Sequence, residues 1–458
     1  MLKFCAIFIF SLITACAPKI EEVPLPIEIA DTFTIAGSEP LQTHWWLALQ
    51  DPQLNQLIEQ ALAENFSLKA AYNRLEQAQI TAQQSGAELI PSLTASFTGS
   101  QQYSNSGDSS PFSLGLTASY EVDLWGRIRA NQQAAELDAQ ATVEDIKTAA
   151  LSLSSEVAIA WYRLVEQRSQ LNLLNRQIKT NQDNVQLVMS RFAGAQASAA
   201  DLYQQQQTLE ASQGDAYLVR SNIKVLENLL SILVGKTPTS IELPQKDYLP
   251  DLTEQPLTGL SSDLIQRRPD IRKAYYQVQS ANQRVASAIA DRFPKLSLSA
   301  NVNTSSPDLQ SLFNNWIATM AGNVILPIID GGRRVAVVDI NKAQAKEALN
   351  NYASTLQTAV KEVEDALIQE QEQQKYLLSL NKQYQLSQQA TDQIRLRFIY
   401  GAIDFLRVLT TQISQQNLER QQITAKRQLI EYRLKLYRAL AGGWDLKQES
   451  PITEKENG

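Results

Sequence analysis

The sequence contains very little histidine, cysteine, glycine or proline. Among 458 residues there are one histidine (His44), two cysteines, 17 glycines and 16 prolines. A single histidine argues against histidine-based metal sites and catalytic triads, and so few glycines and prolines favour long helices. The formal net charge is −7 and the pI is about 5.1, so no basic excess is available for nucleic acid. The composition therefore predicts a largely helical protein that is neither an enzyme nor a nucleic-acid binder and uses no cofactor or metal.

The first sixteen residues resemble the signal peptide and lipidation site of a bacterial lipoprotein. Lys3 gives a positive start, and residues 4–12 form an apolar run too short to cross a bilayer as a helix. Ile13-Thr14-Ala15-Cys16 then matches a lipobox, whose cysteine thiol takes a diacylglycerol and whose new amino terminus is acylated. Two or more acyl chains anchor a protein stably. We therefore predict a signal peptide at residues 1–15, lipidation at Cys16 and, since Ala17 rather than Asp follows, an outer-membrane location.

An ordinary signal peptide with a chance cysteine is the alternative for this segment.

The chain repeats its landmarks at an offset of about 206 residues. One motif, Tyr-Glu-Val-Asp-Leu-Trp-Gly-Arg, ends at Arg127, and a second, Pro-Ile-Ile-Asp-Gly-Gly-Arg, ends at Arg333. Arg191-Phe192 likewise recurs as Arg397-Phe398. A period near 200 residues is too long for a solenoid, so the spacing indicates duplication of a whole structural unit. The predicted order is a lipidated tether at 16–40, a first repeat at 41–250, a second repeat at 251–445 and a flexible C-terminal tail at 446–458.

Four segments alternate apolar and polar residues, as strands with two different faces do. The alternation is clearest from Phe112 to Leu124, is repeated at 92–98 and 296–303, and is less regular at 316–328. Strands of roughly 10–13 residues can cross an outer membrane when tilted. Four strands cannot close a barrel, and an open sheet edge is not tolerated in lipid. We therefore predict that three chains build one closed, twelve-stranded barrel.

Two long proline-free stretches carry a sustained heptad pattern. They lie between Pro111 and Pro238 and between Pro327 and Pro451. Apolar residues at a 4-3 spacing predict coiled-coil helices of about 60 residues, or roughly 90 Å each. The helices would turn near 193–199 and 400–403 and then return to Leu233 and Leu440, while residues 52–88 form a shorter helical segment. A soluble α+β protein with a long helical hairpin is the alternative.

Proline and glycine mark the places where a strand would bend into a helix. The fixed φ of proline and the free φ of glycine suit such bends. The candidate junction residues are Pro91, Trp125, Gly126, Arg127, Pro294, Pro327, Gly331 and Gly332.

Together these motifs resemble the TolC-like outer membrane efflux proteins, in the lipoprotein branch that pairs with resistance-nodulation-division pumps. The resemblance spans essentially the whole mature chain. It implies a homotrimer with a twelve-stranded outer-membrane β-barrel continued by a long periplasmic α-helical barrel. It also implies a passive exit duct that docks onto a periplasmic adaptor and an inner-membrane pump. The motifs are Trp45-Trp46 with Asp51-Pro52-Gln53-Leu54, Asp123-Leu124-Trp125-Gly126-Arg127, Arg268-Pro269-Asp270-Ile271-Arg272, Arg292-Phe293-Pro294 and Ala441-Gly442-Gly443-Trp444.

The resemblance also directs attention to the second helix turn as the gate. In better-known members, a Tyr three before the turn glycine, an Arg two after it and acidic residues at six, at nine or at both positions after it hold the inner end shut. Counted from Gly401, this chain has Phe398, Ile403, Arg407 and Thr410, so every position departs from that pattern.

Other residues near the turns remain candidates for the gate. Leu406 matches an apolar constriction of the lipoprotein branch, and Asp404 lies nearby. Asp201 of the first turn aligns with Arg407 under the 206-residue offset, and we hypothesise that the two pair as a lock; the alternative is that both are solvated. Gly194 lies one position early relative to Gly401, which predicts that the two turns differ.

Two other functions stay open at this stage. One is the exit duct of a type I protein-secretion system, and the other is a non-conducting structural lipoprotein or adhesin. Polar residues on one face of each strand favour an open lumen over a solid structure. Gly235-Lys236-Thr237 lacks the earlier glycine of a phosphate-binding loop and instead predicts a helix C-cap.

Overall fold

The computed structural model describes residues 32–33, 44–103, 105, 110–238, 240, 242–252, 255–256 and 267–440. Cys16, most of the tether and the motif at 441–444 lie outside the described residues. The chain divides into two compact units, each assembled from both halves of the sequence. Among the described residues, unit 1 contains those within 72–145 and 270–356, and unit 2 contains those within 29–71, 146–269 and 357–440.

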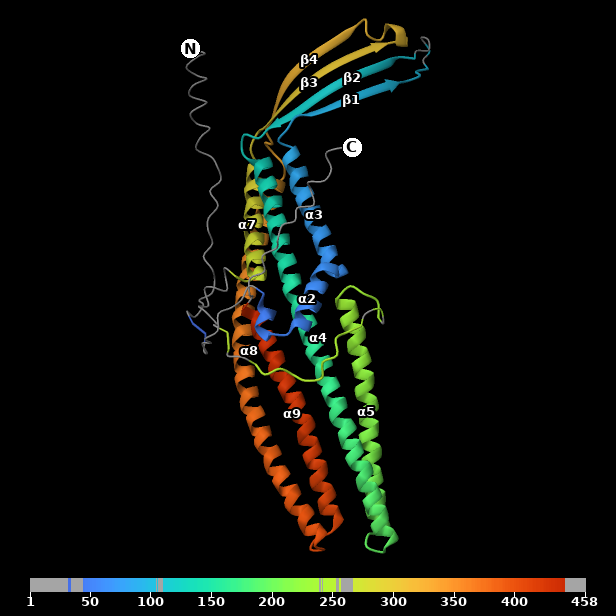
Figure 1. The fold of residues 1–458 in the computed structure, drawn as a ribbon. Coiled ribbons are helices and arrows are strands. Elements are labelled where there is room, and N and C mark those ends of the chain that lie inside the picture. Colours follow the sequence, from blue (N-terminus) through green and yellow to red (C-terminus); the bar gives the residue numbers. More distant parts are fainter. Residues whose placement is uncertain are drawn as a thin grey trace. The chain divides into compact units, whose positions relative to one another are not determined.

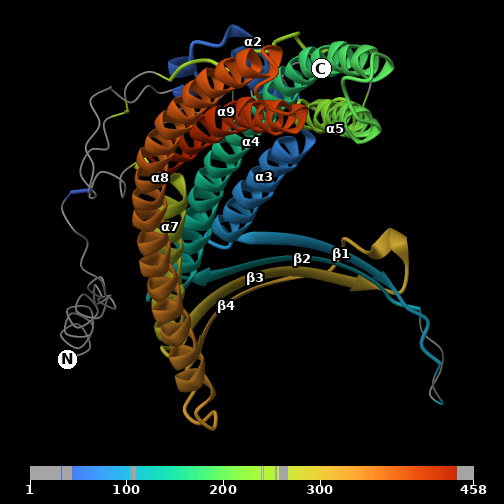
Figure 2. The same ribbon diagram turned by 90° about the horizontal axis from the view of Figure 1, so that it is seen from below.

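Unit 1 contains a four-stranded antiparallel sheet in the order β1-β2-β3-β4, which confirms the four predicted strands. The sheet is curved along its strands (Figures 1 and 2). The second strand ends at Val122 rather than Leu124, because the Leu124 amide turns back to the Val122 carbonyl at 2.8 Å. The fourth ends at Ile325 rather than Ile328. The strands are β1 (Ser92–Gly99), β2 (Phe112–Val122), β3 (Lys295–Ser306) and β4 (Trp316–Ile325).

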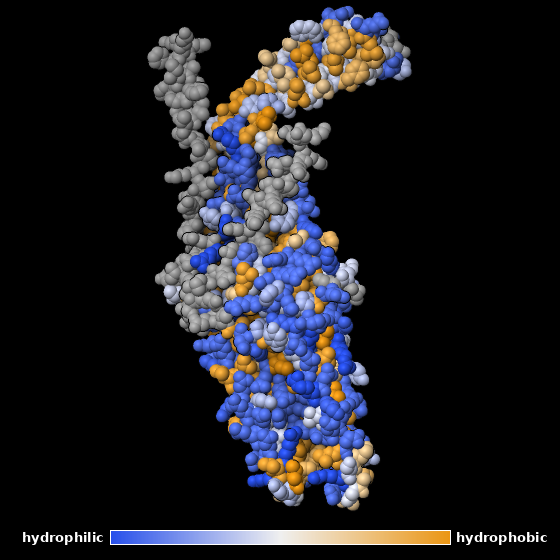
Figure 3. Space-filling model, in the orientation of Figure 1, coloured by the Kyte–Doolittle hydropathy of each residue, from blue (hydrophilic) through white to orange (hydrophobic). Residues whose placement is uncertain are grey.

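The register of the strands places apolar residues beside apolar residues and polar residues beside polar residues across the sheet. One row across the sheet is Leu93, Ala118, Ala300 and Met320, and the next row is Thr94, Thr117, Asn301 and Thr319. One side of the sheet is therefore apolar, and the other carries mainly hydroxyl and amide groups. Apolar surface is conspicuous over the strands in Figure 3. A one-residue slip would exchange the two faces, so this pattern specifies the register strongly.

Helices account for most of the described chain, and their positions repeat. The long helices α4 (Arg127–Ala193) and α8 (Arg333–Ile399) each contain 67 residues and begin 206 residues apart. Each is followed by an antiparallel return helix, α5 (Ala199–Leu233) or α9 (Phe405–Leu440) (Figure 1). The predicted helical hairpins and the duplication are confirmed. None of the helices in the described ranges is long and apolar enough to span a membrane.

The remaining helices are short, and one prediction needs correction. Residues 52–88 form two helices because Asn65 adopts an extended ψ of 125°. The Asn65 side chain accepts a bond from the Leu68 amide and donates to the Leu233 carbonyl, so it caps the second helix and also joins it to α5. The short elements are η2 (Trp45–Leu49), α2 (Pro52–Glu64), α3 (Phe66–Ala87), α7 (Pro269–Ala290) and η3 (Leu309–Ser311).

In unit 2 the first and second helical hairpins are joined by buried polar side chains. Asn181 of α4 is fully buried, accepts bonds from Gln412 and Gln416 of α9, and donates to Ser212 of α5 at 2.9 Å. Asn181 interrupts the apolar heptad pattern of α4. An asparagine in such a position fixes the register of packed helices at some cost in stability.

Asp51, also in unit 2, is the most densely bonded buried carboxylate described. It is 1% exposed and caps the start of α2. One of its oxygens also accepts bonds from the Trp161 indole, the Tyr162 hydroxyl and the Lys246 ammonium, at 3.0, 3.3 and 2.8 Å. Burial acts to raise the pKa of Asp51, but the hydrogen bonds from Lys246 and Trp161 and the charge of Lys246 outweigh it and lower that pKa.

Asp51→Asn should therefore destabilise unit 2 in a pH-dependent way. Removing one partner of a buried ion pair costs about 3–5 kcal/mol. Because the folded pKa lies below the unfolded value, the contribution of Asp51 is complete above about pH 4 and declines as the pH falls through the folded pKa. Thermal unfolding followed by helix circular dichroism should show a difference from wild type that shrinks below about pH 4.

Glu64→Gln is the matched control, since Glu64 pairs with Lys236 at 2.6 Å on the surface and should matter little. A difference for Asp51→Asn that stays constant down to about pH 3 would contradict this account.

Candidate functional site: the sheet–helix junctions and the helix turns

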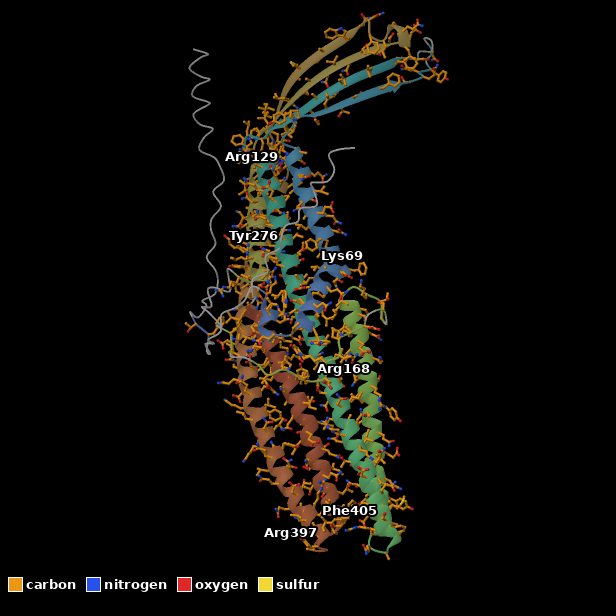
Figure 4. The ribbon with its side chains drawn as sticks, in the orientation of Figure 1. Lys69, Arg129, Arg168, Tyr276, Arg397 and Phe405 are labelled. Carbon is orange, nitrogen blue, oxygen red and sulfur yellow. The ribbon has the colours of Figure 1, made fainter. Side chains whose placement is uncertain are left out.

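The junction between β2 and α4 is built around a left-handed glycine. Gly126 has a φ of 75°, which glycine adopts without strain. Asp123 accepts bonds from the amides of Ile128 and Arg129, both at 3.0 Å, and so satisfies two free amides at the start of α4. Arg127 turns back towards β2 and binds the Glu121 carboxylate at 2.9 Å. Figure 4 labels Arg129 at this junction.

Trp125 connects this junction to the second half of the sequence. Its indole stacks on Phe293 with the ring centroids 4.8 Å apart, and its N–H donates to the Pro294 carbonyl at 2.8 Å. Two junction residues predicted separately, Trp125 and Pro294, therefore meet. Pro91 lies just before β1, and Pro327 lies two residues beyond β4.

The junction between β4 and α8 repeats this design with different residues. Gly331 and Gly332 both have positive φ, at 65° and 82°, and Gly332 aligns with Gly126. Asp330 accepts bonds from the amides of Gly332 and Arg334, at 3.0 and 3.2 Å. Both long helices thus begin after a left-handed glycine and a capping aspartate, although Asp330 lies one position later than Asp123 under the 206-residue offset and Gly331 adds a second positive φ.

The two helix turns, which lie in unit 2, share one backbone conformation. Ala195 in the first turn and Gly401 in the second are left-handed, with φ of 56° and 73°. In both turns the next residue donates to a carbonyl five positions earlier, at 2.8 and 2.9 Å. The prediction that the turns differ is wrong for the backbone, because the left-handed residue of the first turn is Ala195, which aligns with Gly401, rather than Gly194.

The return helices begin with different caps at equivalent positions. Asp201 accepts bonds from the amide and hydroxyl of Ser198, and the Ser198 hydroxyl accepts from the Asp201 amide, which forms a capping box. Asp404 accepts from the Arg407 amide at 3.1 Å. Within the described residues of one chain, neither Asp201 nor Arg407 forms an ion pair. The Ser-Ala-Ala-Asp pattern could have revealed the cap from sequence.

An apolar cluster and one cation–π contact join the two hairpins beside these turns. The Arg191 guanidinium lies 4.2 Å from the centroid of the Phe398 ring, and Phe398 packs on Phe405 at 5.6 Å. Figure 4 shows Arg397 and Phe405 at the α8–α9 turn. Sequence reasoning missed the Arg191–Phe398 contact, although both residues belong to the repeated Arg-Phe pairs. The buried members of the cluster are Val188, Phe405, Val408 and Leu409.

A pocket of about 540 Å³ brings several predicted gate residues together. Its lining includes Asp201, Phe398, Gly401 and Asp404. Leu406 is 46% exposed, and Leu406, Arg407 and Thr410 do not line the pocket. The predicted gate residues therefore form one group between the turns and a second group at the start of α9.

The end of α5 confirms the predicted C-cap. Gly235 has a φ of 77°, and an added Cβ would lie 2.4 Å from the Glu64 carbonyl oxygen. The Lys236 amide donates to the Ser231 carbonyl at 2.8 Å, as at a Schellman-type helix end. No cluster of three or more metal-ligating side chains occurs in the part of the chain that the structure describes.

Exchanging alanine and glycine between the turns should have opposite effects. Gly401→Ala puts a side chain on a left-handed residue and should cost about 1 kcal/mol or more. Ala195→Gly removes a similar strain but adds unfolded-state entropy, so it should be neutral to slightly stabilising. The melting temperature and the rate of proteolysis at each turn would measure both changes. A destabilising Ala195→Gly together with a neutral Gly401→Ala would overturn this assignment.

The chain matches known channel proteins along most of its length. The model of the family described as outer membrane efflux protein matches residues 57–236 and 260–442. The pyoverdine export outer membrane protein OpmQ of Pseudomonas aeruginosa is 30% identical over 415 residues, which cover 87% of each chain. The cation efflux system protein CusC of Escherichia coli K12 is 28% identical over 436 residues, or 91% of each.

A solved structure shares the fold. The open-state outer membrane channel MtrE of Neisseria gonorrhoeae superposes with a TM-score of 0.82 at 28% identity, covering 93% of this chain and 98% of that one. The duplicated strand–helix architecture and the resemblance inferred from sequence are thus confirmed. This chain belongs to the outer membrane efflux protein family.

Proposed function

We propose that three copies of this chain form the exit duct of a tripartite efflux system, through which small molecules leave passively across the periplasm and outer membrane. The observation that carries the proposal is the four-stranded sheet, which has one apolar face and one polar face. Among the described residues, no strand pairs with the outer side of β1 or of β4. A membrane barrel needs lipid-facing apolar residues, a polar interior and no free edge. Three such sheets would meet all of these requirements with twelve strands.

An exposed apolar stripe on α5 supports assembly with further copies. Leu218, Val225, Leu229 and Ile232 follow a 7-4-3 spacing, and all four are exposed in the single chain. This is the spacing by which helices pack in coiled coils. A second copy of this chain is the partner we assign to the stripe, because the sheet edges require the same copies.

The relatives support small-molecule export and partner pumps. OpmQ is named as a pyoverdine export protein, and CusC is named as a protein of a cation efflux system. We propose that this chain likewise works with a periplasmic adaptor and an inner-membrane pump of the resistance-nodulation-division class. The α8–α9 turn offers exposed Ile399 and Tyr400 as contact residues for the adaptor.

The direct test of the duct is single-channel recording. Purified protein inserted into a planar bilayer should give discrete conductance steps. If the protein inserts fully into the bilayer but does not conduct, and the turn variant Gly401→Ala does not conduct either, the result would favour a non-conducting structural lipoprotein.

We also propose that Cys16 carries the lipid anchor. Cys16→Ser removes the thiol that would take the diacylglycerol, so the variant should remain an uncleaved precursor or be mislocalised. Membrane fractionation and intact mass would show the loss of the acyl groups. If Cys16→Ser fractionates as the wild type does and its mass shows no loss of acyl groups, Cys16 does not carry a lipid anchor.

For the gate we propose two contributions. Within one chain, the apolar cluster and the Arg191–Phe398 contact hold the two hairpins together. Between neighbouring chains, Asp201 and Arg407 would form a ring of ion pairs. Exposed pairs contribute about 0–1 kcal/mol each, so only the complete ring would bias the closed state.

Charge and capping can be separated at Asp201. Asp201→Asn removes the charge but keeps an acceptor for Ser198, whereas Asp201→Ala removes both. If the ring exists, Asp201→Asn and Arg407→Gln should each raise conductance and vancomycin sensitivity. The single reversals Asp201→Arg and Arg407→Asp should do the same, and the double variant that carries both reversals should be as closed as wild type. Conductance that rises only in Asp201→Ala would assign Asp201 to capping alone.

A further inference from the structure

The four strands contain almost no charged residues. Among their described residues, β1 and β4 have none, β2 has only Glu121 and β3 has only Lys295. Both lie on the polar face, since Glu121 pairs in register with Ser297 and Lys295 lies two residues away. Hydroxyl and amide groups make up most of the rest of that face.

Each of these two charges is matched by an opposite charge from beyond the strand. Arg127, the first residue of α4, donates twice to one Glu121 oxygen, at 2.9 and 3.2 Å. Lys295 pairs with Asp291 at 2.8 Å, and Asp291 also pairs at 3.3 Å with Arg334, whose second acidic partner is Asp330 at 3.8 Å. We name Glu121, Arg127, Lys295 and Asp291 the neutral collar.

The Glu121–Arg127 pair depends on the shape of the junction. The left-handed Gly126 turns the chain so that Arg127 lies over the end of β2. The side chains of Arg127 and Glu121 are only 21% and 29% exposed, so water screens the pair incompletely. Losing one partner would leave the other as an uncompensated charge on the polar face.

We propose that the neutral collar makes the barrel wall indifferent to substrate charge, so that cationic, anionic and neutral small molecules pass it alike. The proposal rests on the proposed duct, in which the polar face lines the lumen. Rings of uncompensated charge are the usual means by which pores select ions. Here the only charges on the strands are cancelled locally, so any charge preference of the duct would originate outside its strands.

The test uses reversal potentials in planar bilayers under a KCl gradient at low salt, where screening is weak. Glu121→Gln would leave three free Arg127 guanidinium groups and shift permeability towards anions, and Arg127→Gln would free Glu121 and shift it towards cations. Three unit charges about 10 Å from a passing ion should change the permeability ratio roughly two- to eightfold. The double variant Glu121→Gln/Arg127→Gln has the wild-type charge and should have the wild-type reversal potential.

The outcomes separate this inference from the proposed function. Wild-type protein that does not conduct would defeat the duct itself. Conducting single variants with unchanged reversal potentials, or with shifts in the same direction, would overturn the neutral collar. A shift in the double variant as large as in either single variant would also overturn it, because structure rather than charge would then be responsible.

Discussion

The unpaired backbone at the two edges of the sheet is the constraint on which the rest of the structure depends. Within the described residues of one chain, strands β1 and β4 each have one side without a partner strand. Lipid offers no hydrogen bonds, so such edges must meet other edges. Duplication supplies four matched strands per chain, and the alternating faces specify the register of all four. The junction glycines then begin the two long heptad helices.

The two halves keep the same backbone while their side chains have diverged. Ala195 and Gly401 hold the same left-handed position, and Asp201 and Arg407 occupy the same place in their return helices. Backbone geometry must be shared for equivalent hairpins to pack, whereas the side chains at the turns are free to differ. Side-chain contacts between the two turns, such as Arg191–Phe398, are therefore not fixed by the shared backbone.

Most of the fold could be predicted from the sequence because its signals are periodic. Alternation located four strands, and heptads located both long helices and the turns at which they end. The break at Asn65 was missed because a single polar residue does not interrupt helical periodicity. The Arg191–Phe398 contact was missed because contacts between hairpins are not visible in the spacing of residues. The cap at Asp201 was overlooked, although the spacing from Ser198 to Asp201 is that of a capping box. Asn181 interrupts the apolar heptad pattern, but in the structure it is buried and hydrogen-bonds to side chains of α5 and α9.

Oxidative crosslinking between β1 and β4 tests the central claim most directly. Chains carrying one cysteine in β1 and one in β4, with the cysteine pair varied to sample the register, would be oxidised in the membrane and compared with single-cysteine controls. Edge-to-edge closure predicts covalent trimers for at least one pair and none for the controls. Monomers throughout, together with a monomeric native mass in mild detergent, would contradict the account.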